Sequence, residues 1–574
     1  MLLFKKIFLI VLSQLVAFTY FDLKAQNKAS EIVYLQTDRT AYITGESIYF
    51  KLYVLDAATK KCSTLSKVGY VIIRAANWAP SLKILVKVDA GMANGSIVLP
   101  DTLTSGVYQI VVYTSIMRNL GEAHFFHKEI TIANRFDKSL DFKLIETHQK
   151  DTFQFQLPDS GLQIKTDKAV YGMREKVHVK LSKINSKANV SVSVFEEPKI
   201  PSTYNTISEV LGNSSIISNS KHPLTYYSPE IKGKILRGTV IDVKTNQRIK
   251  NAIVLLSCID TVPNLQYALT NSGGLFQMLL SDYYNGKELF LTIKDVPEDQ
   301  NWQIKIEDEF TLSEKWNPLL VSDDENYKDF IIKSQNIVYI NKSYKLNTDS
   351  NGTHLIDNKL ICPWFYHCPA VTTLTADFVP LNNFPEISIE LLHHLRIVKE
   401  NGKFHAQIYN DLMGGFDERN PAIFLDGVFV DDINKIIGLG SEQIKKIDLI
   451  TVERAFGDLL FSGIISITSN TNEMINSKPA SYSLRYKNDD LNTGKKFIAI
   501  NPYTIQNNIP FIKQLLYWNP NLELNGDGDT SFEFYTSDNL TKYSIKIEGV
   551  SEDGVPISAS SSIQVTNQIN VADK

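Results

Sequence analysis

Cysteine, histidine and acidic side chains in the second half of this 574-residue chain could bind a metal ion or form a disulfide. Cys362, His367 and Cys368 supply three soft ligands within one short segment. No fourth ligand stands at a spacing typical of a metal site. We therefore favour a disulfide between the two cysteines in an oxidising compartment, or cysteine side chains that only pack against their neighbours. The adjacent His393 and His394 would point about 100° apart on a helix and could not easily share an ion.

A second group of acidic residues has part of the spacing of a calcium-binding loop. Asn525, Asp527 and Asp529 match the first three ligand positions, but the loop also needs Gly at its sixth position and Glu at its twelfth. Thr530 and Thr536 stand there, so a polar β-turn is the favoured interpretation. The chain contains no G-x-S-x-G, H-E-x-x-H, G-x-x-x-x-G-K-[ST] or G-x-G-x-x-G motif, so we predict no enzyme activity and no cofactor.

The strongest pattern in the chain is a segment that occurs twice. LQTDRTAYITGESIYFKL at 35–52 returns as IKTDKAVYGMREKVHVKL at 164–181, an offset of 129 residues (164 − 35). Identical pairs are Thr37 and Thr166, Asp38 and Asp167, Tyr42 and Tyr171, Glu46 and Glu175, Lys51 and Lys180, Leu52 and Leu181. Repetition at a fixed period indicates one structural unit used more than once.

The charged pairs Asp38/Arg39 and Asp167/Lys168 in this repeat could be two copies of a binding site or two copies of a turn. Two modules that need the same turn are the simpler explanation. We therefore expect Asp38 and Asp167 to hydrogen-bond turn backbone, with Glu46 and Glu175 at the entry of the following strand.

The elements around the repeat are predicted to be short strands. Ser47–Leu55 places Ile48, Phe50, Leu52 and Val54 on one face, which is the period of a half-buried strand. Further strands are expected at Val68–Arg74, Leu82–Val88, Gly95–Leu99 and Val107–Thr114. This spacing predicts a β-sandwich over residues 27–135. A second such unit with its connection is predicted over 136–230.

The second half of the chain combines more strands with one region of mixed character. Strands at Gly233–Val243, Ala252–Ser257 and Leu275–Leu280 predict a sandwich over 231–296, and residues 297–385 are left unassigned. Within 386–475, a helix is expected at Ile387–Leu395, a strand at Ala422–Leu425, and a helix-like step from Ser441 through Ile444 and Ile447. Strands at Thr530–Thr536, Thr541–Gly549 and Ser558–Val565 predict a last sandwich within 476–574.

The N-terminus predicts export. Lys5 and Lys6 precede an apolar run, and Leu23-Lys24-Ala25 offers a cleavage context before Gln26, so residues 1–26 are predicted to be a signal peptide. An uncleaved anchor is the alternative, but Ser13, Gln14 and Thr19 interrupt the roughly 20 apolar residues that a spanning helix needs. The net charge of −4 gives no strong field, so nucleic acid is not an expected partner.

The repeated segment resembles macroglobulin domains, the β-sandwiches of alpha-2-macroglobulin-like proteins. The resemblance rests on Thr37-Asp38-Arg39, Tyr42, Gly45-Glu46 and Phe50-Lys51 with their second copies, and residues 516–549 of the last sandwich are similar. The thioester of complement-like members needs a Cys-Gly-Glu-Gln run, and none of the four cysteines precedes a glycine. The resemblance therefore implies architecture without covalent trapping.

Two further resemblances lie in the middle of the chain. Gly238-Thr239-Val240, Ala252–Leu255 and the Asn271–Phe276 turn are similar to a carboxypeptidase-regulatory-like domain, an accessory without catalysis. Residues 386–475 resemble the plug of TonB-dependent receptors through Pro421–Val428, Arg454–Asp458 and Phe461–Ile465. Only 99 residues follow (574 − 475), too few for the many strands of a barrel, so the resemblance implies a plug without a barrel in the same chain.

Together these resemblances point to Gram-negative envelope proteins that combine macroglobulin-like, regulatory-like and plug-like domains. We expect a mainly β fold of tandem β-sandwich domains of the macroglobulin or immunoglobulin type, with one small α/β plug-like domain. The expected function is a non-enzymatic scaffold or binding protein, exported to the periplasm or the outer-membrane face. Alternatives are an accessory of TonB-dependent uptake and a protease inhibitor without the thioester. The expected partner is an envelope protein, such as an outer-membrane barrel, contacted through Asp426, Gly427, Asp431, Phe456, Gly457, Phe461 and Gly463.

Overall fold

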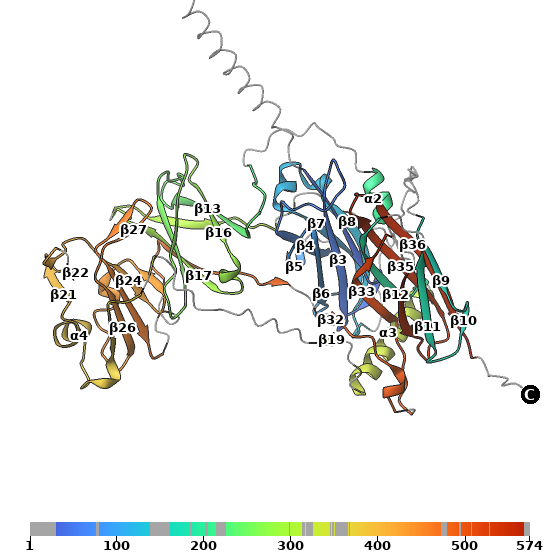
Figure 1. Cartoon of the computed structure of the whole chain (residues 1–574). Helices are drawn as coiled ribbons and strands as arrows, with labels where there is room; N and C mark the ends of the chain where they lie inside the picture. Colours follow the sequence, from blue (N-terminus) through green and yellow to red (C-terminus); the bar gives the residue numbers. More distant parts are fainter. Residues whose placement is uncertain are drawn as a thin grey trace, which may run out of the picture. The chain divides into compact units, whose positions relative to one another are not determined.

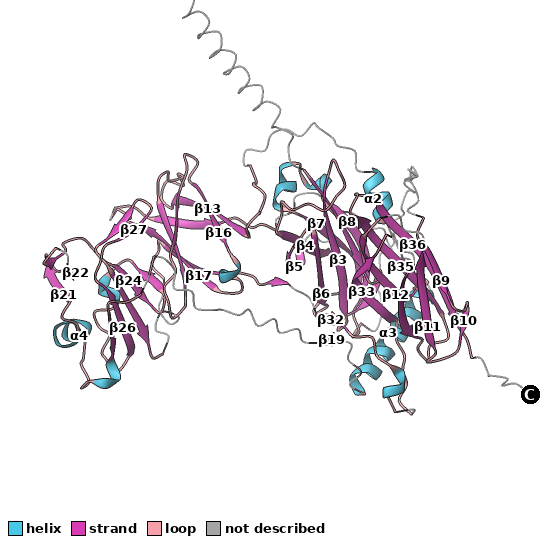
Figure 2. Cartoon of the chain, in the orientation of Figure 1, coloured by secondary structure: helices cyan, strands magenta, loops and turns pink. Residues whose placement is uncertain are grey.

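The described part of the chain is built mainly from β-strands, as expected (Figure 2). The structure is a computed structural model. It describes residues 30–75, 80–137, 161–182, 186–200, 205–213, 226–297, 299–310, 312, 316, 325–344, 346, 349–350, 365–366, 368–411, 413–471, 474, 479–492, 495–506, 508–526 and 529–567. The predicted signal peptide, residues 1–26, lies outside them. Within these residues no helix has the length and apolar character needed to cross a membrane.

The described residues form two compact units that alternate along the chain (Figure 1). Unit 1 is drawn from Met1–Ile231, Phe310–Thr353 and Asn492–Lys574. Unit 2 is drawn from Lys232–Glu309 and His354–Leu491. The chain therefore passes four times from one unit to the other, and unit 2 is an insertion into the sequence of unit 1.

The first two sheets of unit 1 form the N-terminal sandwich. One sheet has the order β1 (Glu31–Thr37), β3 (Ser47–Asp56), β6 (Met92–Val98). The other contains β2 (Ala41–Ile43), β8 (Phe126–Ala133), β7 (Gly106–Tyr113), β4 (Val68–Ala75) and β5 (Pro80–Lys87) in that order. All five strands predicted here are present with small shifts of their ends, because alternating apolar side chains such as Ile48 and Phe50 are fully buried.

The other two sheets of unit 1 form a composite sandwich, built from two segments far apart in the sequence. One sheet has the order β10 (Val170–Tyr171), β36 (Pro556–Val565), β35 (Lys542–Ser551), β12 (Ala188–Glu196), β33 (Leu515–Leu524). The second has the order β34 (Thr530–Tyr535), β11 (Lys176–Ser182), β9 (Gln163–Thr166). Strand β12 pairs antiparallel with β35 on one side and β33 on the other.

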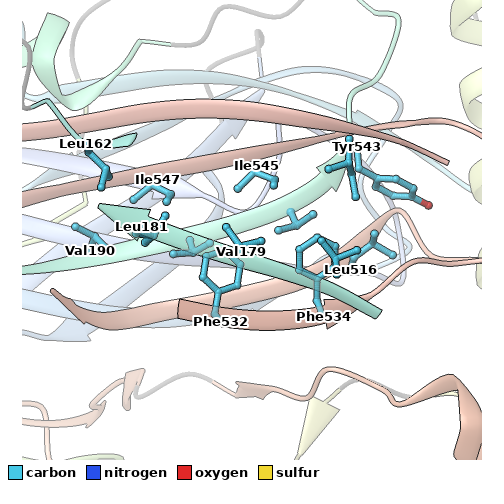
Figure 3. Close-up of a cluster of buried hydrophobic side chains, with 14 of the residues drawn as sticks. Leu162, Val179, Leu181, Val190, Leu516, Phe532, Phe534, Tyr543, Ile545 and Ile547 are labelled. Atoms are coloured by element: carbon cyan, nitrogen blue, oxygen red, sulfur yellow. The ribbon is translucent and has the colours of Figure 1, made fainter. Parts of the chain in front are cut away.

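A single hydrophobic core unites the two segments of the composite sandwich. Figure 3 shows Val179, Leu181 and Val190 from the earlier segment lying together with Phe532 and Ile547 from the later one. The expectation of two separate sandwiches, one in 136–230 and one in 476–574, is therefore corrected: each segment supplies only part of a sandwich. Period-two patterns identify strands but not their neighbours, which explains the error.

The sheet of β1, β3 and β6 is covered on both faces, since the composite sandwich packs on its outer side. Lys51 donates to the Asn189 side chain at 3.2 Å, and the Tyr53 hydroxyl lies 3.1 Å from that of Ser191. These alternate residues of β3 make the outer face polar, whereas the inner face is apolar. The two sandwiches are thus joined by hydrogen bonds between side chains of two sheets.

Helix α3 (Glu325–Ser343), from the region left unassigned, also belongs to unit 1. Its Tyr327 and Ile331 pack with Ala41, Ile43 and Ala133 of the N-terminal sandwich. On the same helix, Ser334 accepts a 2.8 Å hydrogen bond from Gln514, next to β33 of the composite sandwich. α3 therefore contacts both sandwiches.

Unit 2 begins with an inserted sandwich. Its sheets have the orders β16 (Leu275–Leu280), β13 (Lys234–Asp242), β18 (Trp302–Ile306) and β15 (Gln266–Leu269), β14 (Ile253–Cys258), β17 (Glu288–Lys294), β30 (Ser483–Lys487). The predicted boundaries of 231 and 296 change, because β18 comes from the unassigned region and β30 from the predicted last domain. β17 pairs with β30, placing Leu291 opposite Leu484.

The mixed domain completes unit 2. Its main sheet has the order β20 (Val371–Leu374), β26 (Ile444–Ile450), β29 (Ile464–Ser469), β24 (Ala422–Leu425), β25 (Val428–Val430). Beside it lie α4 (Phe384–Leu391), β21 (Leu395–Glu400), β22 (Lys403–Asn410), β23 (Gly415–Phe416) and the hairpin β27 (Arg454–Phe456), β28 (Leu459–Phe461). The expected combination of helix and strands is present, and Asn383 caps α4 by accepting from the Glu386 amide.

One helical expectation in the mixed domain is wrong. Ile444 and Ile447 belong to strand β26, and no helix starts at Ser441. A β-bulge between Ile444 and Lys446 adds one residue to the strand, so apolar residues three positions apart are both buried. This bulge imitates the spacing of a helix in the sequence.

Short elements complete the described structure. They are α2 (Ile207–Asn213), β19 (Asp349–Ser350), β31 (Leu491–Asn492), β32 (Lys496–Phe497), and the 3₁₀ turns η1 (Ser115–Asn119), η2 (Glu122–His124), η3 (Asp282–Tyr284), η4 (Thr375–Asp377), η5 (Ile433–Lys435) and η6 (Pro502–Thr504).

The composite sandwich predicts that a mutation late in the chain destabilises strands early in it. Ile547→Ala should lower the free energy of unfolding of unit 1 by about 2–5 kcal/mol, because Ile547 is fully buried in the shared core. Amide hydrogen exchange should become faster in β11 and β12. Ile467→Ala, an equally buried change in the mixed domain, is the control and should leave β11 and β12 protected. Unchanged exchange of β11 in Ile547→Ala would contradict the composite sandwich.

Candidate functional site

The charged residues of the first repeat copy form a buried hydrogen-bonded cluster. The Asp38 carboxylate accepts from the Tyr42 hydroxyl at 2.9 Å and from the Tyr49 amide at 2.8 Å. Arg39 pairs with Asp38 at 3.1 Å and with Glu46 at 3.3 Å. The cluster therefore fixes the turn between β1 and β3.

The second copy makes the same contacts 129 residues later. The Asp167 carboxylate accepts from the Tyr171 hydroxyl at 2.7 Å and from the His178 amide at 3.0 Å. Lys168 pairs with Glu175, which also accepts from the Gly172 amide at 2.6 Å. Both aspartates accept from a backbone amide, but the amide belongs to the following strand, β3 or β11, and not to the turn as predicted. Glu46 and Glu175 bind the amides at the turn, those of Ile43 and Gly172.

The two copies differ in their surroundings. Asp38 is fully buried and Arg39 is 7% exposed, whereas Asp167 is exposed. Burial outweighs the nearby Arg39 and the hydrogen bonds, and raises the pKa of Asp38 to about 6. Slight burial raises the pKa of Asp167, but the hydrogen bonds from Tyr171 and the backbone outweigh it, so the net pKa is lowered. The same local hydrogen bonds therefore accompany a raised pKa at Asp38 and a lowered pKa at Asp167.

A cavity of about 360 Å³ adjoins the first cluster. Gln514 lines it and accepts from Arg39 at 3.0 Å, so the cavity includes the junction of the two sandwiches. Lys513, also in the wall, donates to the Asn341 side chain of α3 at 2.8 Å. The charged residues of the lining are Arg39, Arg135, Lys342, Lys513 and Glu46. Two of these cations are already paired with carboxylates, Arg39 with Asp38 and Glu46 and Arg135 with Asp101.

Four of the predicted partner-contact residues are buried inside unit 2. Asp426 accepts from the Ser469 amide at 2.7 Å and from its hydroxyl at 2.8 Å. Gly427 has a φ of 83°, and a Cβ there would lie 2.6 Å from the Asp260 carbonyl oxygen. Phe461 and Gly463 are buried as well. The expectation that these four residues face a partner is corrected: they hold the mixed domain together and against the inserted sandwich.

The other three predicted contact residues lie closer to the surface. Tyr482 and Lys435 both donate to the Asp431 carboxylate. The Phe456 ring, half-buried, packs 5.3 Å from the ring of Tyr267. Gly457 is exposed at the turn of the β27–β28 hairpin. Their role as partner contacts stays a prediction.

The metal-like and disulfide-like groups of the sequence are only partly described. Cys362 and His367 lie outside the described residues, so the disulfide to the exposed Cys368 stays a prediction. His394 lies 3.7 Å from Asp411. Asp527 of the calcium-like spacing is also outside the described residues. Across the described ranges, no three His, Cys, Asp or Glu side chains gather closely enough to hold a metal ion.

Asp529, the last of the three calcium-like positions, pairs with Lys180 of β11. This ion pair connects β11 with the residue just before β34, and the two strands are neighbours in the composite sandwich. This contact agrees with the polar-turn interpretation.

The cavity-lining residues that lie outside the repeat were not predicted from the sequence. Gln514 and Lys513 lie in a segment with no motif, and α3 lies in the unassigned region. Only the apolar residues Tyr327, Ile331 and Ile337, spaced for one helix face, could have indicated α3.

Comparison with known proteins yields structural similarity only. No protein-family model matches the chain, and no curated protein matches it. The structure aligns with Escherichia coli alpha-2-macroglobulin activated by porcine elastase over 93% of this chain and 44% of that chain, at 9% identity and a TM-score of 0.24. Salmonella alpha-2-macroglobulin reacted with methylamine aligns over 93% and 39%, at 7% identity and a TM-score of 0.24.

The Yersinia pseudotuberculosis adhesin InvE aligns over 48% of this chain and 58% of that chain, at 11% identity and a TM-score of 0.13. The chain spans less than half the length of the two macroglobulins. At these TM-scores the similarity carries no argument about function.

Removal of the tyrosine hydroxyl should destabilise the protein more in the first repeat copy than in the second. Tyr42→Phe should cost about 1–3 kcal/mol of stability, because the buried Asp38 then loses a hydrogen bond that water cannot replace. Tyr171→Phe, the matched change, should cost only about 0.5–1.5 kcal/mol, because water can reach Asp167. Urea denaturation of both variants measures the difference. A larger loss in Tyr171→Phe would contradict this account.

The raised pKa of Asp38 also predicts a pH dependence. Because the folded protein holds this proton more tightly than the unfolded chain, with pKa values of about 6 and 3.8, the Asp38 contribution is full below pH 4 and is lost as the pH rises to 6. The loss amounts to at most about 3 kcal/mol. The stability difference between the wild type and Asp38→Asn, measured from pH 4 to 7, should therefore shrink as the pH rises. A difference that grows with pH would refute the assignment.

Proposed function

We propose that the chain is a non-enzymatic, exported scaffold or binding protein of the cell envelope. The observation that carries this proposal is the role of the charged residues in the repeat, which hydrogen-bond the backbone of their own copy in both cases. The segment with the strongest pattern in the sequence thus supports architecture rather than chemistry. The predicted signal peptide supports export.

The arrangement of the chain supports the scaffold role. Unit 2 is attached to unit 1 by four chain passages rather than one flexible linker. Unit 1 itself closes only when the segment after unit 2 supplies β33 to β36. Two segments that both belong to unit 2 are thus inserted in the sequence of unit 1, which suits a protein built to present a binding surface.

The β27–β28 hairpin of the mixed domain is the proposed partner surface. Leu460 on this hairpin is 54% exposed, and Gly457 at its turn is exposed too. The resemblance of residues 386–475 to a receptor plug supports an envelope protein, such as an outer-membrane barrel, as the partner. An accessory role in TonB-dependent uptake is the second candidate, and the same resemblance favours it.

Site-specific photo-crosslinking in intact cells tests the proposed surface. A crosslinking amino acid at Leu460 should give one dominant adduct with an envelope protein, because this side chain projects from the hairpin. The same amino acid at Val98, 50% exposed on β6 of unit 1, is the matched control and should not give that adduct. Equal adducts from both positions, or fractionation of the protein with the cytoplasm, would overturn the proposal.

A further inference from the structure

A lysine, an asparagine and a glutamate meet in the interior of unit 2. Lys234 Nζ donates to Asn488 Oδ1 at 3.3 Å and lies 3.3 Å from Glu309 Oε2. Lys234 is 3% exposed, and Glu309 and Asn488 are each 4% exposed. Charged side chains are rarely buried to this degree, so the cluster needs an explanation.

The fold holds each member of this cluster in place. Lys234 opens β13, and Glu309 follows β18, the antiparallel neighbour of β13 in the same sheet. Asn488 follows β30 in the other sheet of the inserted sandwich. Its amide nitrogen donates to the Tyr284 carbonyl at 2.7 Å, so its oxygen, and with it the carboxamide carbon, faces the lysine. The cluster therefore bridges the two sheets.

We propose that Lys234 and Asn488 become joined by an intramolecular isopeptide bond, with Glu309 as the proton-transfer group. The amine nitrogen lies 3.3 Å from Asn488 Oδ1, so the fold holds the amine beside the carboxamide that it would attack. The proposal concerns a covalent modification and does not depend on the proposed scaffold function.

The reaction balances without any co-reactant. Glu309 takes a proton from the Lys234 ammonium, and the neutral amine attacks Cγ of Asn488 to form the new C–N bond. Glu309 then returns this proton to the amide nitrogen of Asn488 as the C–Nδ2 bond breaks, and it takes up the second proton that the former lysine nitrogen loses. The products are a secondary amide and one molecule of ammonia, and no atom is oxidised or reduced.

Burial assists the proton transfer that starts this reaction. Burial lowers the pKa of Lys234, but the neighbouring Glu309 outweighs it and the net pKa is raised, so the resting pair is ionic. An ion pair out of contact with water pays a large desolvation cost. Transfer of the proton from Lys234 to Glu309 removes both charges, and with them the desolvation cost, which opposes the mutual attraction that keeps the resting pair ionic.

The position of the bond in the chain gives it a structural consequence. Lys234 lies two residues after the chain enters unit 2 at Lys232, and Asn488 lies three residues before it leaves at Leu491. The bond would join the first and last strands of the inserted sandwich and enclose nearly all of unit 2 in one covalent loop. Closing so long a loop restricts the unfolded chain and stabilises the folded unit.

Mass spectrometry of the purified, folded full-length protein tests the proposal. The intact mass under denaturing conditions should be lower by one ammonia than the mass expected from the sequence. Proteolytic digestion should yield a branched peptide that contains both Lys234 and Asn488. Cleavage before Gln26, instead of after it, would leave a glutamine whose cyclisation also releases ammonia, so the branched peptide is the deciding observation. A linear Lys234 peptide in the digest of the folded protein would overturn the proposal.

Matched variants identify the role of Glu309. Glu309→Gln should keep the full mass, because no group remains to move the proton. Glu288→Gln changes another glutamate of the same sandwich, which pairs with Arg485 on β30, and should still lose ammonia. Ammonia loss at Lys234 in Glu309→Gln would refute its role. If Glu309→Gln does not fold, the wild-type digest still decides whether the bond exists.

A second lysine–asparagine contact provides a control within the same molecule. Lys51 donates to Asn189 at 3.2 Å, and in the part of the chain that the structure describes no carboxylate pairs with it. Proximity alone would join these two residues as well, whereas the proposed mechanism leaves them linear. A branched Lys51 peptide would show that Glu309 is not required.

Discussion

Unit 1 depends on strand β12 finding two neighbours from the far end of the sequence. β12 ends at Glu196, and its partners β33 and β35 begin at Leu515 and Lys542. Until they arrive, the backbone groups and the apolar face of β12 are unsatisfied, which is costly for a central strand. Contacts over such sequence separation form late in folding, because the chain entropy of the loop must be lost first. The whole of unit 2 lies within this loop, so its folding into a compact body brings the two segments of the composite sandwich closer together.

The two copies of the repeat show which properties of a charged cluster depend on the nearby sequence and which depend on the surrounding fold. Asp38 and Asp167 receive the same two kinds of hydrogen bond, from a tyrosine hydroxyl and from a strand amide. Their pKa values nevertheless move in opposite directions, because the composite sandwich covers the first copy and solvent reaches the second. Turn geometry is encoded within about fifteen residues, whereas the electrostatic character of the turn is set by what packs over it.

The same division explains what could be predicted from the sequence. Strand positions such as Leu275–Leu280 follow from local patterns, and so does a backbone hydrogen bond to Asp38; both are present. The pairing of β12 with β33 could not be predicted, because period two identifies a strand without naming its neighbour. The β-bulge at Ile444 imitated a helix for a related reason: spacing alone does not distinguish a turn of helix from a strand with one extra residue. Asp426 was predicted to contact a partner, but its carboxylate accepts a hydrogen bond from the Ser469 amide inside the domain.

The buried cluster in unit 2 could not be predicted from the sequence either. It consists of Lys234, Glu309 and Asn488. No motif links three residues so far apart, and each alone would be taken for an ordinary surface side chain. Antiparallel pairing brings β18 back along β13, and the second sheet supplies Asn488, so the cluster exists only once both sheets of the inserted sandwich have packed. Its chemistry is therefore conditional on folding: the packing that buries the lysine and the glutamate away from water also places the amine beside the carboxamide. A covalent bond made there would form after the inserted sandwich is complete, and it would preserve that fold without directing it.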